Sequence, residues 1–178
     1  MLSFYRAWLW HPKSGHAVHR GLNGAAVGAG LALALACDLR YATPEAGLSM
    51  PFTSLGIHPG MASAVLLPEV SGLAVARGNV VDRSAAGRAD AVAAGLVNQG
   101  FPAESLWADV LEITSPMATR APIAIRLTRQ ALTDGGHASF EAVLEWEAVS
   151  SAADDGDPGP ARGDRGSAAT TEPGVHRA

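Results

Sequence analysis

The sequence predicts a globular α/β protein. Hydrophobic residues make up 48% and charged residues 17% of the 178 positions, which is enough apolar material to bury a sizeable core. Short extended segments at 38–43 and 48–50 lie between apolar segments with helical spacing. We therefore expect strands and helices to alternate within one domain, or within part of a larger one.

The charge and cysteine content exclude several classes of partner. Thirteen basic and 17 acidic side chains give a formal charge of −4, with no basic stripe to follow a phosphate backbone, so we expect no nucleic-acid partner. The single cysteine, Cys37, lies at the end of an apolar helix, which favours a buried, unreactive thiol. The longest apolar run, 31–37, is too short to span a bilayer. We expect no membrane association and a cytoplasmic location.

The first 20 residues have an irregular pattern. Residues 4–10 hold four aromatic side chains in seven positions and are compatible with two helical turns. Residues 11–20 fit neither the helical nor the strand period and are interpreted as a loop. The histidines of this loop, His11, His16 and His19, have no accompanying cysteine or carboxylate cluster. A solvated loop is therefore favoured over a metal site, and we expect no metal.

The stretch from residue 21 to 38 pairs a turn with a buried helix. Asn23-Gly24 is a strong turn dipeptide, and Gly28 and Gly30 allow a close approach of the backbone to a ligand or another segment. Free amide N–H groups at the start of the following Ala/Leu-rich helix suit an anionic oxygen. The alternative is that small residues only let this helix pack flat against its neighbours. The spacing alone leaves both interpretations open.

The next segments are predicted to form a hairpin-like pair followed by a long loop. Residues 44–47 form a turn that reverses the strand 38–43 into the extended run 48–50. Residues 51–60 contain two prolines and two glycines and are too irregular for a helix or strand. This loop is long enough to line a pocket, so we expect chemistry to take place there.

The remaining chain is predicted to be mainly helical. We expect a helix from 61 to about 72, an apolar segment at 73–81, a short helix at 89–94, a short strand or extended connector at 96–101, and helices at 104–117 and 123–133. Ser139 is a suitable cap for a last helix. Beyond Ser150 the composition becomes rich in Gly, Ala, Arg and Asp, which predicts disorder. The expected organisation is a divergent segment 1–20, a core 21–110, helices 111–150 and a disordered tail 151–178.

Four ordered segments resemble the enoyl-CoA hydratase/isomerase family, the crotonase superfamily. They are residues 23–30, 36–42, 55–60 and 94–97, and the resemblance covers about residues 21 to 150. It implies a spiral of ββα turns with its N-terminal half missing, followed by helices that pack across a homotrimer or hexamer. It also implies an acyl-CoA thioester as substrate, with coenzyme A as part of that substrate and no separate cofactor.

The resemblance also assigns roles to individual residues. It places an oxyanion N–H at Ala29, with Gly30 beside it. The positions implied to contact substrate are Gly28, Phe52, Leu55, Gly56, Pro59 and Gly60. His58 is the titratable side chain of the loop that could act as a base, although it could instead cap or fill the loop. Asp38 resembles an aspartate that holds backbone or a basic partner.

Departures from the family pattern leave two functional hypotheses. Ala32 and Phe52 occupy the positions of the two hydratase glutamates, and neither can move a proton. The apolar strand expected before Asn23-Gly24 is replaced by residues 16–22, and the tail replaces the final helix. A gene fragment with frame shifts after Leu9 and near Ser150 would explain both ends. The protein is therefore expected to hydrate or isomerise an acyl-CoA, or to be an inactive CoA-thioester binder or oligomerisation partner.

Overall fold

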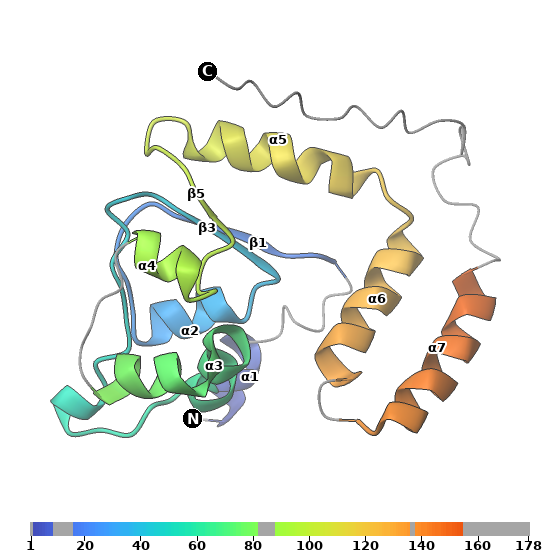
Figure 1. Ribbon diagram of the computed structural model, residues 1–178, viewed down its shortest axis with the longest axis horizontal. Coiled ribbons are helices and arrows are strands. Elements are labelled where there is room, and N and C mark those ends of the chain that lie inside the picture. Colours follow the sequence, from blue (N-terminus) through green and yellow to red (C-terminus); the bar gives the residue numbers. More distant parts are fainter. Residues whose placement is uncertain (1, 9–15, 82–87, 136–137, 155–178) are drawn as a thin grey trace, which may run out of the picture. The chain divides into compact units, whose positions relative to one another are not determined.

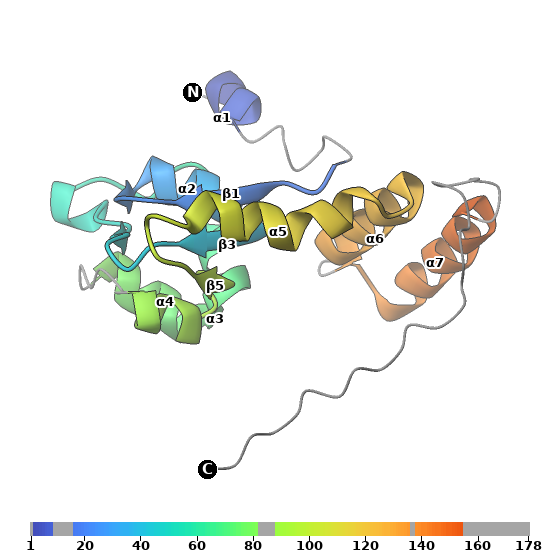
Figure 2. The same cartoon turned by 90° about the horizontal axis from the view of Figure 1, so that it is seen from above.

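The computed structural model describes residues 2–8, 16–81, 88–135 and 138–154. The chain divides into two compact units, Met1–Ala118 and Thr119–Ala178, and each is described by itself. In chain order (Figures 1 and 2), the elements are α1 Leu2–Trp8, β1 His19–Leu22, β2 Ala26–Val27, α2 Ala29–Leu35, β3 Leu39–Ala42, β4 Leu48–Ser49, the 3₁₀ turn η2 Thr53–Leu55, α3 Ser63–Val81, α4 Arg88–Ala93, β5 Gln99–Gly100, α5 Leu106–Ala118, α6 Pro122–Gly135 and α7 Phe140–Asp154.

Two parallel sheets organise the first unit. The larger sheet has the order β1-β3-β5, and the smaller sheet pairs β2 with β4. His19 pairs with Leu39, Ala26 with Leu48, and Tyr41 with Gln99. Because parallel neighbours require crossover connections, the helices between the strands return the chain to the same end of each sheet. The predicted α/β class is confirmed.

The predicted hairpin between 38–43 and 48–50 is wrong. Both segments are extended, but β3 pairs with β1 and β5, whereas β4 pairs with β2. The turn at 44–47 therefore carries the chain from one sheet to the other. Local turn signals identify where the chain changes direction, but they do not specify which strand becomes the neighbour.

The expectation that residues 16–22 lack a strand is also wrong. Residues 19–22 form β1 and pair along their whole length with β3. Of this strand only Leu22 is buried, so the alternation of apolar side chains that normally reveals a strand is absent. Backbone pairing with β3 defines β1.

The core lies on both sides of β3. Tyr41 packs with Leu106 and Val110 of α5 in a small cluster. Ala42 belongs to the main cluster, which also contains Leu31 of α2 and residues of α3 and α4. Figure 1 accordingly shows α5 above the sheet and α2, α3 and α4 below it. The two-residue period of β3 thus supplies opposite faces to two helical layers.

The helices follow the predicted segments with two differences. The prediction of disorder is wrong for residues 151–154, which belong to α7. The segments expected at 61–72 and 73–81 are joined in α3, which is kinked at Gly72, where φ is 76° and ψ is 160°. Ser139 caps α7 as predicted, because its Oγ accepts a hydrogen bond from the Ala142 N–H at 3.2 Å. The helix α7 continues to Asp154, and the later residues lie outside the described part of the chain.

Candidate functional site

A glycine turn leads into the short helix α2. Gly28 adopts φ 55° and ψ −115° immediately before Ala29, the first helical residue. Its N–H donates to Ser49 O at 2.9 Å, and its own carbonyl accepts from the Ala32 N–H at 3.0 Å. The N–H groups of Ala29 and Gly30 precede this first helical hydrogen bond, and both residues are exposed. The turn therefore leaves these N–H groups outside the helical hydrogen-bond pattern, on exposed residues.

The Phe52 ring lies on the side of this turn toward which a Gly28 side chain would point. A Cβ atom built on Gly28 would lie 3.5 Å from Phe52 Cζ and 3.8 Å from Cε1. The ring also contacts the main core cluster, while Ala32 is 0% exposed within that cluster. The two positions matched to hydratase glutamates thus carry an aromatic ring beside the glycine turn and a methyl group in the core.

The loop after η2 is open to solvent. Leu55 is 69% exposed, and Gly56 ends η2 with a φ of 71°. The exposed His58 ring places Nδ1 2.6 Å from Pro59 O. Because a carbonyl oxygen only accepts, Nδ1 is the donor if this contact is a hydrogen bond. The other ring nitrogen, Nε2, takes no part in this contact.

The end of the loop is closed by contacts around Gly60. Its carbonyl accepts hydrogen bonds from the Ser63 N–H at 3.1 Å and from Ser63 Oγ at 2.6 Å. The next two residues, Met61 and Ala62, have positive φ angles of 57° and 56°. Side chains rarely adopt this conformation, so the start of α3 is held by its surroundings.

The structure brings only some of the predicted site residues together. The Phe52 ring lies on the Cβ side of Gly28, and Ser49 O accepts a hydrogen bond from the Gly28 N–H. Around the Cβ direction of Gly30, no described atom outside its own helix and neighbours lies within 4 Å. His58 is thus not packed against that side of Gly30.

The sequence interpretation missed two polar residues beneath these segments. Asn79 is 3% exposed, and its Oδ1 accepts a hydrogen bond from the Met50 N–H at 3.1 Å. Arg40 is 6% exposed and donates from Nε to Leu96 O at 2.8 Å and from Nη1 to Cys37 O at 2.6 Å. Asn79 and Arg40 are each surrounded in the sequence by mainly apolar residues, and nothing near them in the sequence indicates which backbone groups they bind.

The groups around the start of β3 are structural. Asp38 Oδ2 accepts a hydrogen bond from the Val18 N–H at 2.7 Å, which confirms that Asp38 holds backbone. Burial raises the pKa of the Cys37 thiol, although Arg20 and Arg40 act in the opposite direction. The buried thiol is confirmed. In the described ranges no three His, Cys, Asp or Glu side chains are grouped to hold a metal ion, and His11 lies outside those ranges.

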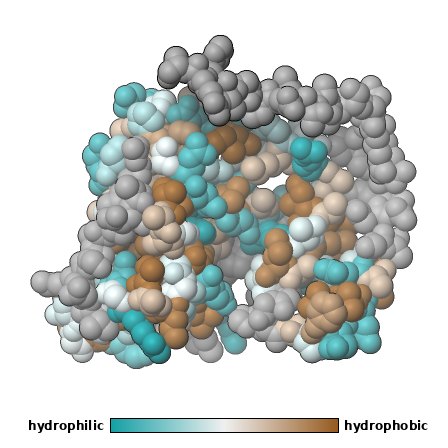
Figure 3. Space-filling model, viewed as in Figure 1, coloured by the Kyte–Doolittle hydropathy of each residue, from teal (hydrophilic) through white to brown (hydrophobic). Residues whose placement is uncertain are grey.

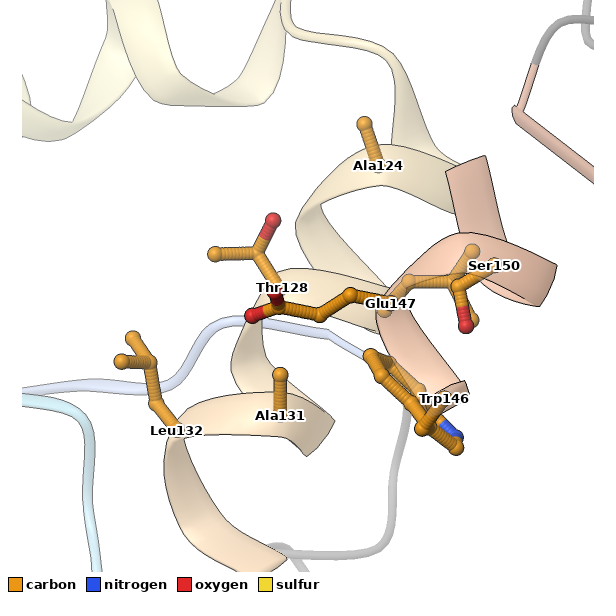
Figure 4. A pocket seen from close by; sticks show the side chains of 8 residues that line it. Ala124, Thr128, Ala131, Leu132, Trp146, Glu147 and Ser150 are labelled. Carbon is orange, nitrogen blue, oxygen red and sulfur yellow. The ribbon is translucent and has the colours of Figure 1, made fainter. Parts of the chain in front are cut away.

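The second unit contains a cavity of its own between α6 and α7. Its volume is about 310 Å³, and Figure 4 shows side chains of both helices around it. It is lined by Ala124, Leu127, Thr128, Ala131, Leu132, Trp146, Glu147 and Ser150. None of these residues belongs to the predicted site. No helix within the described residues has the length and apolar character needed to cross a membrane.

The chain belongs to the enoyl-CoA hydratase/isomerase family, because the model of that family matches residues 14–150. It is 29% identical over 126 residues to the short-chain-enoyl-CoA hydratase of Clostridium acetobutylicum, covering 71% of this chain and 48% of that relative. It is 33% identical over 126 residues to the 2,3-dehydroadipyl-CoA hydratase of Escherichia coli K12, covering 71% and 49%. The chain thus spans about half the length of the curated relatives it matches.

A solved structure confirms the predicted fold. The crystal structure of an enoyl-CoA hydratase/isomerase from Cupriavidus metallidurans CH34 is similar with a TM-score of 0.82 and 28% sequence identity. The similarity covers 88% of this chain and 61% of that one. The strands, helices and glycine turn described above are therefore part of a crotonase fold.

Proposed function

We propose that this chain binds acyl-CoA thioesters and stabilises the enolate formed from them, in a hydration or a double-bond isomerisation. The family membership and the hydratases among its relatives support this substrate class. Hydration adds water across the double bond conjugated to the thioester, and isomerisation moves a proton from one carbon to another, so coenzyme A enters as part of the substrate and no separate cofactor is needed. A cytoplasmic location is part of the proposal.

The observation that carries the proposal is the glycine turn before α2. Gly28 turns the chain directly into α2, so the N–H groups of Ala29 and Gly30 come before the first hydrogen bond of the helix. Both residues are exposed. A preorganised N–H donor costs no reorganisation when negative charge develops on the thioester oxygen. We assign the oxyanion donor to Ala29, with Gly28, Phe52 and the loop from Leu55 to Gly60 bordering the substrate.

His58 is the proposed base. In the proposed tautomer Nδ1 donates to Pro59 O, which leaves Nε2 available to accept a proton from substrate or water. The matched glutamate positions carry Ala32 and Phe52, so proton transfer has to come from another group. A His58→Ala variant is expected to lose turnover while retaining thioester binding, and unchanged turnover would exclude this role.

A second candidate function is thioester binding without catalysis. The observation that favours it is the replacement of both carboxylates, one by a methyl group that is 0% exposed and one by a ring packed against the main core cluster. Backbone donors and a loop that borders substrate are sufficient for binding. Such a chain would retain affinity for acyl-CoA and show no turnover.

The experiment that tests both functions uses crotonyl-CoA and a pair of Ala29 variants. Loss of the conjugated thioester absorbance reports turnover, and a thermal shift with crotonyl-CoA reports binding. Ala29→Pro removes the N–H at the first helical position, where proline is well tolerated, and Ala29→Ser retains it. We expect Ala29→Pro to lower turnover roughly 10²- to 10³-fold relative to Ala29→Ser. Binding without turnover supports the second function, and neither signal would contradict both.

We also propose that copies of the chain assemble as a trimer or hexamer through α6 and α7. No side chain with described burial between 119 and 150 is fully buried. Leu132, Phe140 and Val149 are 78%, 73% and 73% exposed, and Figure 3 shows hydrophobic side chains reaching the surface among hydrophilic ones. Two helices without a buried core need a further surface for stability. Light scattering of the purified chain and of a Leu132→Glu variant tests this, since assembly through α6 predicts a smaller mass for the variant.

A further inference from the structure

The segment from Ser49 to Thr53 bridges the glycine turn and the end of α3. Ser49 O accepts a hydrogen bond from the Gly28 N–H at 2.9 Å. One residue later, the Met50 N–H donates to Asn79 Oδ1 at 3.1 Å. The first contact holds the turn, and the second holds α3. Successive residues of one strand end are therefore fixed to two different elements.

At the start of η2, one residue again lies beside the glycine turn and the next is bonded to α3. The Phe52 ring lies on the side of Gly28 toward which a side chain would point, because a Cβ atom built on Gly28 would be 3.5 Å from Phe52 Cζ. Thr53 Oγ1 donates a hydrogen bond to Val80 O at 2.6 Å. The two α3 partners, Asn79 and Val80, are adjacent in the last turn of that helix. The hydrogen bonds of Met50 and Thr53 to α3, here called the two anchors, thus lie on either side of Phe52 in the sequence.

The two anchors differ in burial. Asn79 is 3% exposed, so its amide lies in the core and has little freedom to move. Met50 is 0% exposed, and its N–H would lose its partner in the core without the Asn79 oxygen. Thr53 is exposed, so its hydroxyl can be removed without opening a cavity. The Asn79 anchor is therefore buried in the core, whereas the hydroxyl of the Thr53 anchor can be removed without disturbing the core.

We propose that Asn79 and Thr53 are positioning residues: they hold the segment from Ser49 to Phe52 beside the glycine turn, and the Ser49–Gly28 hydrogen bond then fixes the direction of the Ala29 N–H. Neither residue touches the site itself; both act through Phe52 and the end of β4. Their effect on thioester binding rests on the proposed function, whereas their effect on the glycine turn does not. The site geometry is consequently set from the last turn of α3.

The first experiment removes the Thr53 anchor. Thr53→Val is nearly isosteric and loses the hydroxyl, Thr53→Ser retains it, and Thr114→Val removes a comparable hydroxyl from α5, where Oγ1 bonds to Val110 O at 2.8 Å. We expect Thr53→Val alone to shift the ¹H–¹⁵N resonances of Gly28, Ala29 and Gly30, because ring shifts depend on where Phe52 lies. Crotonyl-CoA affinity should fall about fivefold in Thr53→Val and return in Thr53→Ser.

The second experiment changes the buried anchor. Asn79→Asp keeps an acceptor oxygen for the Met50 N–H, whereas Asn79→Leu keeps a similar volume without one. The same three resonances should move further in Asn79→Leu than in Asn79→Asp. If the Asn79 variants do not fold, the Thr53 series still decides the matter.

The outcomes separate this proposal from the proposed function. Unmoved Gly28 to Gly30 resonances in Thr53→Val, as in Thr114→Val, would overturn the positioning role. Shifted resonances in a protein whose wild type does not bind crotonyl-CoA would support the positioning role and contradict the function. Shifted resonances with unchanged affinity would overturn the link between Phe52 position and binding.

Discussion

The Tyr5 hydroxyl of α1 lies 2.7 Å from the point where a Cβ atom on Gly60 would stand. Tyr5 also packs against the main core cluster, so the N-terminal helix is seated directly on the loop that ends in Gly60. A side chain at position 60 would have to displace the hydroxyl. We expect Gly60→Ala to lower the free energy of unfolding by about 1–3 kcal/mol, measured by urea denaturation.

A second substitution identifies the cause of this loss. In Tyr5→Phe the hydroxyl is gone, and the next ring atom, Cζ, is 3.5 Å from the added methyl group, an ordinary contact. The cost of Gly60→Ala should therefore be smaller in the Tyr5→Phe background than in wild type. Equal costs in the two backgrounds would show that α1 is not seated in this way.

Among the glycines whose surroundings the structure describes, Gly95 is expected to be the least tolerant of a side chain. Its φ is 75°, and an added Cβ atom would lie 2.8 Å from the backbone oxygen of Val70. Both strain and overlap oppose the substitution, so Gly95→Ala should cost roughly 2–4 kcal/mol of unfolding free energy. Gly47→Ala is the matched control, because nothing lies within 4 Å of its Cβ position. Similar thermal unfolding of the two variants would contradict this explanation.

The buried guanidinium of Arg40 is expected to be a major contributor to stability. It satisfies two backbone carbonyls, Leu96 O and Cys37 O, which tie β3 to the segments on either side. Arg40→Met keeps most of the volume but leaves both oxygens without their donors, so we expect a loss of roughly 2–4 kcal/mol in urea denaturation. Arg126→Met, on the exposed surface of α6, should change the midpoint little.

Stability should fall below neutral pH because of His19. Its Nδ1 is buried without a hydrogen-bond partner. Burial lowers the pKa of His19 from its ordinary value of 6.5, and the nearby Asp38 carboxylate opposes this shift only in part. The unfolded chain therefore binds the proton first. Stability contributed by the neutral ring is present above pH 6.5 and is lost as the pH falls through the lowered pKa.

The His19 prediction is checked by urea midpoints at two pH values on either side of this transition. Wild type and His16→Gln should lose more stability on acidification than His19→Gln, which has no titrating group at this position. An equal loss in all three proteins would assign the acid sensitivity to other groups.

Much of the fold was predictable because side-chain patterns are local. A few neighbouring residues are enough to predict the Ala/Leu run of α2, the short helix α4 and the Ser139 cap of α7. β1 was missed because only Leu22 of this strand is buried, and the 38–50 hairpin was predicted wrongly because strand pairing depends on distant segments. Register in a parallel sheet is a tertiary property.

In the candidate site, too, local features were predictable and contacts between distant segments were not. The glycine turn and the loop 51–60 were recognised separately from their composition and from the family resemblance. Their connection through Phe52 and Gly28, and the support from Asn79 beneath them, join residues about 25 or more positions apart. Nothing in the neighbourhood of Asn79 in the sequence indicates that Met50 is its partner, so this part required the structure.

The strand pairing has a consequence for how the chain folds. His19 pairs with Leu39, Ala26 with Leu48 and Tyr41 with Gln99, so every pairing among the described strands joins distant residues across a crossover. No hairpin is present in these sheets to serve as a fast local nucleus. Loop-closure entropy must be overcome before any strand gains a neighbour, which slows folding. The helix α2 lies within both of the shorter crossovers, from β1 to β3 and from β2 to β4, so these two pairings each close a loop that contains it.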